Sequence, residues 1–180
     1  ESIKFKKSKL IFSLLKSGDF RDDSGIYFSY GDFTCLADVD CNFVNFGNLP
    51  KVDLYCSSYA GGATAYPIMF DNYKLSDKNK KQKMDSVFLL KQKIDNLRVT
   101  KSKYFLPYAG SFETRLTRDA YVSKNLYKNK IEDYEKRLHS QNVEVLNTDN
   151  FNYYIFKNKK LIKKVKLKIK KIEDFKEKKF

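Results

Sequence analysis

Short apolar segments alternate with two long segments of helical periodicity, and this order constrains the fold more than any other feature. The apolar segments are residues 52–56, 104–106 and 143–146, and the helical patterns between them cover 76–98 and 117–139. A strand–helix–strand–helix–strand order is typical of α/β proteins, in which helices cover a parallel sheet. The sequence therefore predicts an α/β fold.

The segments on either side of this unit favour β-structure. Gly31-Asp32 separates the β-prone residues 25–30 and 33–37, which predicts a hairpin. Residues 9–16 are too short to distinguish a strand from a helix. Near the C-terminus, residues 151–156 and 161–169 predict two more strands. In the last strand apolar residues alternate with lysines, which is typical of a half-buried edge strand.

Each helical pattern has an apolar face. In 76–98 the apolar face comprises Met84, Val87, Phe88, Ile94 and Leu97, interrupted by the aliphatic stem of Lys91. In 117–139 it comprises Ala120, Tyr127, Ile131, Tyr134 and Leu138. We expect both helices to pack on one face of a sheet that contains 33–37, 52–56, 104–106 and 143–146. The other face of that sheet should be apolar and available to another part of the protein.

The positive charge is concentrated in the C-terminal segment. The chain has 180 residues and a formal net charge of +14, and residues 157–180 contain twelve Lys against three acidic residues, which leaves +5 for the other 156. This favours a partial α/β domain over 1–156 and a lysine-rich strand or tail over 157–180. Nucleic acid is not the expected partner of the body of the chain, and no apolar run is long enough to span a bilayer.

The cysteines indicate a reducing environment. Cys35, Cys41 and Cys56 are odd in number and widely spaced, so we expect no disulfide framework. The chain begins at Glu1, without an initiator Met or a charged start that leads into an apolar stretch. We therefore expect a cytoplasmic protein, of which this chain is a piece.

Three loops rich in small and polar residues follow successive predicted strands. They are Asp38–Asn42, Ser57–Ala63 and Pro107–Phe112. The carboxyl ends of parallel strands meet at one edge of a sheet, so these loops should converge there as a candidate site. Asp38 and Asp40 could face one cation, or they could simply initiate a turn. The single histidine, His139, is expected to favour a helix C-terminus rather than ligate a metal.

The sequence of these loops resembles that of a known family, the CMP-N-acetylneuraminate hydroxylases, over roughly 25–112. The blocks that carry the resemblance are Asp38–Asn42 (DVDCN), Phe46–Pro50 (FGNLP), Val52-Asp53, Tyr59–Ala63 (YAGGA) with Pro67, and Pro107–Gly110 (PYAG). It implies the second half of a metallo-β-lactamase-like α/β/β/α sandwich, joined in the intact protein to a Rieske domain.

The resemblance also implies roles for particular residues. Asp38 would be a metal ligand, and the substrate contacts would be Asp40, Asn42, Tyr59, Gly61, Gly62 and Tyr108. The HxHxDH motif that supplies the other ligands in this superfamily is absent from the chain, as are Rieske Cys/His pairs. Iron and the Rieske 2Fe–2S cluster would therefore be held by parts of the protein outside this chain, including its N-terminal half, and we expect neither on the isolated segment.

Three functional hypotheses follow. The first is a segment of a hydroxylase-like oxygenase acting on a sugar nucleotide, with electrons from the Rieske domain. The second is a metallo-β-lactamase-like hydrolase of a phosphoester or lactone, in which a metal activates water. The third is a non-enzymatic basic binding domain that uses the lysine-rich tail.

Overall fold

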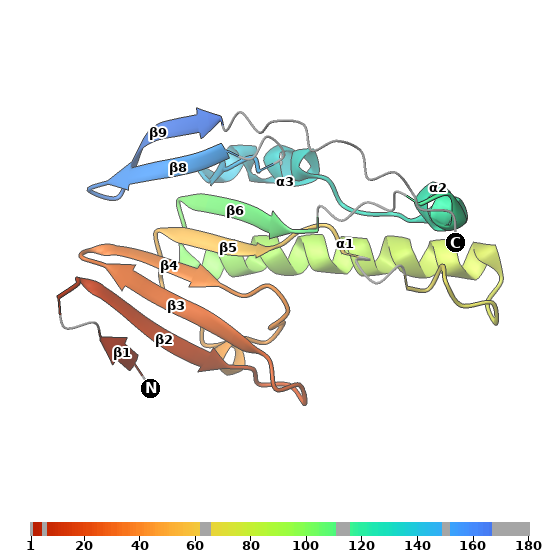
Figure 1. Ribbon diagram of the computed structural model, residues 1–180, viewed down its shortest axis with the longest axis horizontal. Helices are drawn as coiled ribbons and strands as arrows, with labels where there is room; N and C mark the ends of the chain where they lie inside the picture. Colours follow the sequence, from red (N-terminus) through yellow and green to blue (C-terminus); the bar gives the residue numbers. More distant parts are fainter. Residues whose placement is uncertain (1, 5–6, 62–65, 111–115, 149–151, 167–180) are drawn as a thin grey trace, which may run out of the picture.

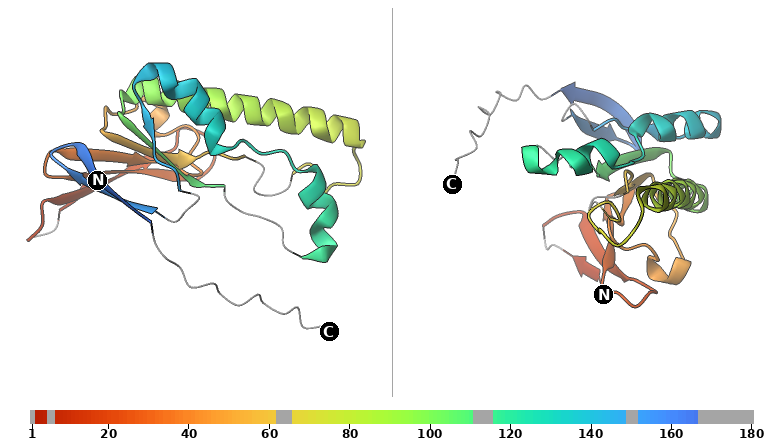
Figure 2. Two further views of the ribbon diagram at one scale, coloured as in Figure 1. Left: turned by 90° about the horizontal axis from the view of Figure 1, so that it is seen from above. Right: turned by 90° about the vertical axis from the view of Figure 1, so that its right-hand side faces the viewer.

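A central sheet separates two helices from a C-terminal β-hairpin (Figures 1 and 2). The computed structural model of the chain describes residues 2–4, 7–61, 66–110, 116–148 and 152–166. In the left view of Figure 2, α1 (Leu75–Thr100) lies on one side of the sheet and the hairpin on the other. The fold is thus built in three layers.

The strands of the sheet follow one another in sequence order. They are β1 Ser2–Lys4, β2 Leu10–Lys16, β3 Ser24–Tyr30, β4 Phe33–Ala37, β5 Leu54–Ser58, β6 Tyr104–Ala109 and β7 Glu144–Val145. Pairing is antiparallel from β1 to β4 and parallel from β4 to β7. The predicted α/β class and the shared sheet are confirmed, and the ambiguous residues 9–16 form strand β2.

The second predicted helix is interrupted. In place of one helix over 117–139, the chain forms η2 (Thr117–Asp119), α2 (Ala120–Asn125), α3 (Ile131–Leu138) and η3 (His139–Gln141). Gln82 of α1 donates to the Asn125 carbonyl (3.2 Å) and accepts from the Tyr127 N–H (2.8 Å). These bonds hold the linker between α2 and α3 against α1, and its backbone is therefore not available to a continuous helix.

The larger part of the core lies between the sheet and the helices. Leu36, Tyr55 and Phe105 from β4, β5 and β6 pack against Leu97 of α1 and Tyr134 of α3, and all five are buried. The Phe105 and Tyr134 rings lie 5.2 Å apart. Helices α1 and α3 therefore cover the same face of the sheet, as the sequence predicts.

Helix α1 turns a different face to the core than its periodicity predicts. Ile94 and Leu97 are buried as expected, but Met84, Val87 and Phe88 are exposed. The buried positions also include the polar residues Lys78, Gln82, Ser86, Lys93 and Thr100. The side chains of Lys78, Gln82 and Lys93 have partners on neighbouring elements, and these contacts outweigh the apolar periodicity in setting the rotation of the helix. Among the described helices, none is long and apolar enough to cross a membrane.

The opposite face of the sheet is partly covered by the hairpin of β8 (Asn152–Lys157) and β9 (Lys160–Lys166). The Phe156 ring lies 4.8 Å from that of Phe33 and 5.0 Å from that of Tyr104. The predicted boundary at 157 therefore falls inside one hairpin, because β9 pairs with β8 and packs Leu161 on the same face of the sheet. Residues 167–180 lie outside the described part of the chain.

The remainder of this face is apolar and open. Strand pairing places four exposed side chains on the same face as buried Cys35, namely Ile3, Leu14, Ile26 and Tyr30. All three cysteines are free thiols, and the sulfurs of Cys35 and Cys56 lie 3.5 Å apart beneath the hairpin. The prediction of an apolar face opposite the helices is consistent with this arrangement.

The rotation of α1 can be checked by comparing two truncations. Leu97→Ala should lower the free energy of unfolding by about 2–5 kcal/mol, because it leaves a cavity in the core. Met84→Ala should change it by less than about 0.5 kcal/mol, because that side chain is exposed. Denaturant unfolding of both variants measures the difference, and equal losses would contradict the observed rotation.

Candidate site at the carboxyl edge of the parallel strands

The loops that follow β4, β5 and β6 meet at one edge of the sheet. Ser58 Oγ donates to the Val39 carbonyl at 2.9 Å, and the Tyr59 N–H donates to the Ala109 carbonyl at 3.1 Å. Gly110 lies so close to Ala60 that an added Cβ would be 2.4 Å from the Ala60 Cβ. The three predicted loops therefore converge, as parallel pairing requires.

Asp38 forms a buried ion pair directly after β4. Its Oδ2 lies 3.3 Å from Lys93 Nζ of α1, and neither side chain is accessible to solvent. The Tyr55 hydroxyl donates to the same oxygen at 2.6 Å and accepts from Asn96 Nδ2 at 2.9 Å. The other oxygen, Oδ1, has no hydrogen-bond partner among the described residues. One carboxylate oxygen is thus committed to the fold and the other is buried without a partner.

Burial raises the pKa of the Asp38 carboxyl, and the positive charge of Lys93 opposes this rise. A carboxyl whose pKa is higher in the folded than in the unfolded protein stabilises the fold below the unfolded pKa. That contribution is lost as the pH rises through the folded pKa. Lys93 therefore has the role of limiting the cost of keeping Asp38 ionised inside the protein.

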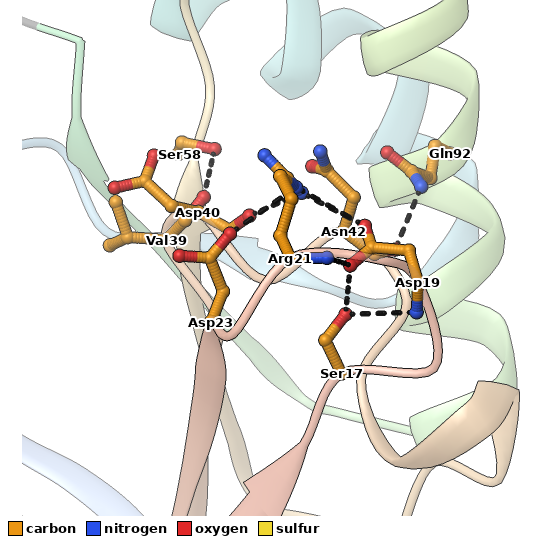
Figure 3. Close-up of polar contacts among 9 residues, drawn as sticks. All are labelled: Ser17, Asp19, Arg21, Asp23, Val39, Asp40, Asn42, Ser58 and Gln92. Atoms are coloured by element: carbon orange, nitrogen blue, oxygen red, sulfur yellow. Dashed lines mark hydrogen bonds and ion pairs between the residues drawn. The ribbon is translucent and has the colours of Figure 1, made fainter.

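Arg21 joins the turn between β2 and β3 to the loop after β4 (Figure 3). Its Nη2 lies 3.1 Å from Asp19 Oδ2 and donates to the Asp40 carbonyl at 2.8 Å, while its Nε lies 3.3 Å from Asp23 Oδ2. Ser17 Oγ donates to Asp19 Oδ1 at 2.8 Å, and this bond is the main reason that the pKa of Asp19 is lowered. Arg21 thus pairs with two carboxylates and balances one of their two negative charges, and these contacts fix the position of the edge.

Helix α1 fixes the other end of the same loop. Gln92 Nε2 donates to the Asn42 carbonyl at 3.0 Å, which Figure 3 shows beside the Arg21 cluster. The backbone of residues 38–42 is therefore held by β5 through Ser58, by the β2–β3 turn through Arg21 and by α1. Such a loop can present side chains in fixed positions.

Several predicted substrate contacts are accessible at this edge. Asp40 and Asn42 have exposed side chains. Tyr108 is partly exposed, and burial of the remainder of its ring raises its pKa to about 12. Gly61 has a φ of +68°, a left-handed conformation that favours glycine. Gly62 lies outside the described residues.

Tyr59 does not fit its predicted role. Its side chain is buried in the core, with the ring 6.5 Å from that of Tyr134 in an edge-on arrangement. The Tyr134 hydroxyl donates to the Tyr59 carbonyl at 2.9 Å. The ring belongs to the same buried cluster as Tyr55, on the helix side of the sheet, and is therefore not available to a substrate at the surface of the edge.

The sequence did not identify Arg21, Tyr55 or Lys93 as part of the site. Arg21 stands between Asp19 and Asp23 at i±2, a spacing that could have indicated a charged clamp. Lys93 has no local signal, since its partner Asp38 is 55 residues away in sequence. In the sequence, Tyr55 cannot be distinguished from any other aromatic residue of a buried strand.

The described residues do not form a metal centre by themselves. They contain no group of three or more His, Cys, Asp or Glu side chains that could hold a metal ion. Asp38 Oδ1 is the one buried carboxylate oxygen among them that lacks a partner. The donor set therefore does not fit a resident metal, and Asp38 could contribute at most one ligand to a site completed elsewhere.

The buried ion pair predicts an asymmetric response to mutation. Lys93→Met should lower the free energy of unfolding by about 3–5 kcal/mol at neutral pH, because it leaves Asp38 as a lone buried carboxylate. The loss should shrink as the pH falls toward about 4, since a protonated Asp38 no longer needs a cation.

Two further variants serve as controls for this experiment. Lys91→Met removes an exposed lysine from the same helix and should change stability by less than about 0.5 kcal/mol. Asp38→Asn added to Lys93→Met should recover part of the loss. A loss in Lys93→Met that is independent of pH would show that the charge of Asp38 is not its cause.

Comparison with known proteins identifies relatives for part of the chain. No protein family profile matches the sequence. Cytidine monophosphate-N-acetylneuraminic acid hydroxylases from Pongo pygmaeus and Mus musculus, and the inactive human protein of that name, are each 32% identical over 124 residues. These residues make up 67% of this chain but only 21%, 22% and 25% of the three relatives. The chain thus spans less than a third of their length.

Two solved structures share a distant likeness. The first is a protein from Parabacteroides distasonis assigned as a metal-dependent hydrolase, with a TM-score of 0.42 and 9% identity. The matched region covers 81% of this chain and 53% of that protein. The second is CmlA, a diiron beta-hydroxylase from Streptomyces venezuelae, with a TM-score of 0.42 and 10% identity. The matched region covers 81% of this chain and 31% of CmlA. In sequence, the chain is similar to one segment of the cytidine monophosphate-N-acetylneuraminic acid hydroxylases, which confirms the resemblance predicted from its loop motifs.

Proposed function

We propose that this chain is a segment of a hydroxylase-like protein that acts on a sugar nucleotide, and that the carboxyl edge of β4, β5 and β6 forms part of its substrate wall. The observation that carries the proposal is the 32% identity to hydroxylases named for a CMP-linked sugar. The human relative is named inactive.

The geometry of the edge supports a role in binding. Asp40 and Asn42 offer a carboxylate and an amide at the surface, and Tyr108 offers a phenol. These groups can exchange hydrogen bonds with the hydroxyl groups of a sugar. The loop that contains Asp40 and Asn42 is fixed by Arg21 and Gln92 before any ligand arrives, which reduces the entropy lost on binding.

The chemistry of oxygen insertion would belong to other parts of the protein. We propose that iron and a Rieske cluster reside outside this chain, and that Asp38 Oδ1, the buried carboxylate oxygen without a hydrogen-bond partner among the described residues, is this chain's contribution to a metal site. The N-terminal part of the same protein would cover the open sheet face of Ile3, Leu14, Ile26 and Tyr30, because such an apolar surface is stabilised by burial.

The activity is tested with the full-length protein. Incubation with CMP-N-acetylneuraminic acid, dioxygen and an electron donor should add one oxygen atom to the sugar, as measured by mass spectrometry. Cleavage of a phosphoester or lactone without dioxygen or a donor would instead support a metal-dependent hydrolase. Absence of both activities, in a preparation shown to contain iron and the cluster, would contradict the enzymatic proposal.

Substrate contact can be tested on the chain itself. Titration with a CMP-linked sugar, followed by amide chemical shifts, should perturb residues 38–42 and 108–110. Asp40→Ala and Asn42→Ala should each weaken binding by roughly fivefold to tenfold, because each removes a hydrogen bond. Asp32→Ala, an exposed aspartate in the turn between β3 and β4, is the matched control and should have no effect. Shifts confined to the lysine-rich C-terminal segment would favour a basic binding domain.

Metal content separates the segment from the whole protein. The purified chain should contain far less than one iron or zinc per molecule, because its described residues offer no set of three ligands. Elemental analysis measures this directly. One tightly bound metal ion per chain that is lost in Asp38→Ala would show that the segment has a complete site of its own.

A further inference from the structure

Three large apolar side chains form an exposed stripe on α1. Met84, Val87 and Phe88 have 62%, 66% and 67% of their surface exposed. Their i, i+3, i+4 spacing places them next to one another on the outer face of the helix. We call these three residues the α1 stripe. Single exposed apolar residues are ordinary, but an adjacent group in the middle of a helix is typical of an interaction site.

The stripe cannot be buried by rotating α1. Lys93 on the inner face is held by Asp38, Gln82 by the linker between α2 and α3, and Lys78 Nζ donates to the Ile68 carbonyl at 3.1 Å. A rotation that turned the stripe inward would break these contacts and leave the Asp38 carboxylate without its cation. Any cover for the stripe must therefore come from outside the described fold.

Positive charges bracket the stripe at both ends. Lys80 lies one turn before Met84 and Lys91 one turn after Phe88; both are exposed, and neither has an ion pair with a described residue. The carboxylate of Asp85, beside the stripe, is already paired with Lys81 at 3.3 Å. The surface is thus an apolar centre with an available cation on either side.

We propose that the α1 stripe docks an acidic amphipathic helix of a protein partner. The apolar side of that helix would cover Met84, Val87 and Phe88, and its carboxylates would meet Lys80 and Lys91. Helices commonly recognise one another through apolar anchors at this spacing, with flanking charges setting the choice of partner. This interaction is independent of the activity proposed above.

Two other occupants fit the charges less well. A second copy of this chain, docked antiparallel, would place Lys80 opposite Lys91 and bring together two chains of +14 each. An anionic bilayer would meet Asp77 and Asp95, which lie seven residues before Met84 and after Phe88 on the same helical face. A short acidic helix can reach from Lys80 to Lys91 without meeting either aspartate.

The test uses synthetic peptides of about 12 residues, which as a helix span the distance from Lys80 to Lys91 without reaching Asp77 or Asp95. One peptide has a leucine stripe flanked by glutamates, and a second has lysines in place of the glutamates. Fluorescence anisotropy with the labelled peptides should show binding of the acidic peptide, weakening with added salt, and no binding of the basic one. Equal binding of both peptides, or of neither, would overturn the proposal.

Matched variants locate the interaction. Val87→Ser should weaken binding of the acidic peptide roughly tenfold or more. Val99→Ser changes the same residue type on the same helix, 53% exposed but outside the stripe, and should have no effect. Thermal unfolding of both variants should match that of the unchanged chain. Equal effects of the two substitutions would contradict docking at the stripe.

Charge reversal tests the orientation of the partner. Lys80→Glu with Lys91→Glu should abolish binding of the acidic peptide and confer binding of the basic one, while Lys124→Glu, an exposed lysine on α2, should do neither. Binding to vesicles of phosphatidylserine and phosphatidylcholine that is lost in Val87→Ser, without peptide binding, would identify a membrane as the occupant. Dimerisation in sedimentation experiments that is lost in Val87→Ser would identify a second copy. Either result would overturn the proposal.

Discussion

The contact between Asp38 and Lys93 joins the sheet to the helix layer at the edge where the loops converge. Both side chains are inaccessible to solvent, so neither charge could be tolerated without the other. The pair fixes the end of β4 against α1, and the hydroxyl of Tyr55 adds β5 to the same contact. The position of the 38–42 loop, and with it the accessible Asp40 and Asn42, depends on this arrangement.

The same contact explains the unusual rotation of α1. A helix that must place Lys93 inward also places Ser86 and Gln82 inward, because they lie on the same face at seven and eleven residues' distance. Asn129 donates to the Ser86 carbonyl at 2.9 Å, and Gln82 holds the linker before α3. Satisfied polar contacts thus occupy the inner face along most of the helix, and apolar side chains in its middle are left on the outside.

The sequence was sufficient to predict the sheet but not the helix faces. Strands β4, β5 and β6 are short apolar runs bounded by turns, so their local pattern agrees with their tertiary role. The apolar periodicity of α1 instead predicts burial of Met84, Val87 and Phe88, which are exposed, because partners remote in sequence set its rotation. The break before α3 was unpredictable for the same reason. Gln82 hydrogen-bonds the backbone of residues 125–127 in place of helical partners, and helical periodicity contains no information about this contact.

The candidate site shows the same division between local and remote information. Convergence of the loops follows from parallel strand order alone, which a sequence can reveal. Whether a side chain in a loop faces solvent or the core depends on the next layer, and Tyr59 illustrates this, since its ring meets Tyr134 from a helix 75 residues later. Asp38 combines both cases. Its place after β4 was predictable, but its commitment to Lys93 leaves one oxygen, Oδ1, without a partner. A buried oxygen in that state is costly to the fold, and the buried Ser57 hydroxyl, which also opposes the rise in the pKa of Asp38, offsets part of that cost from within the chain.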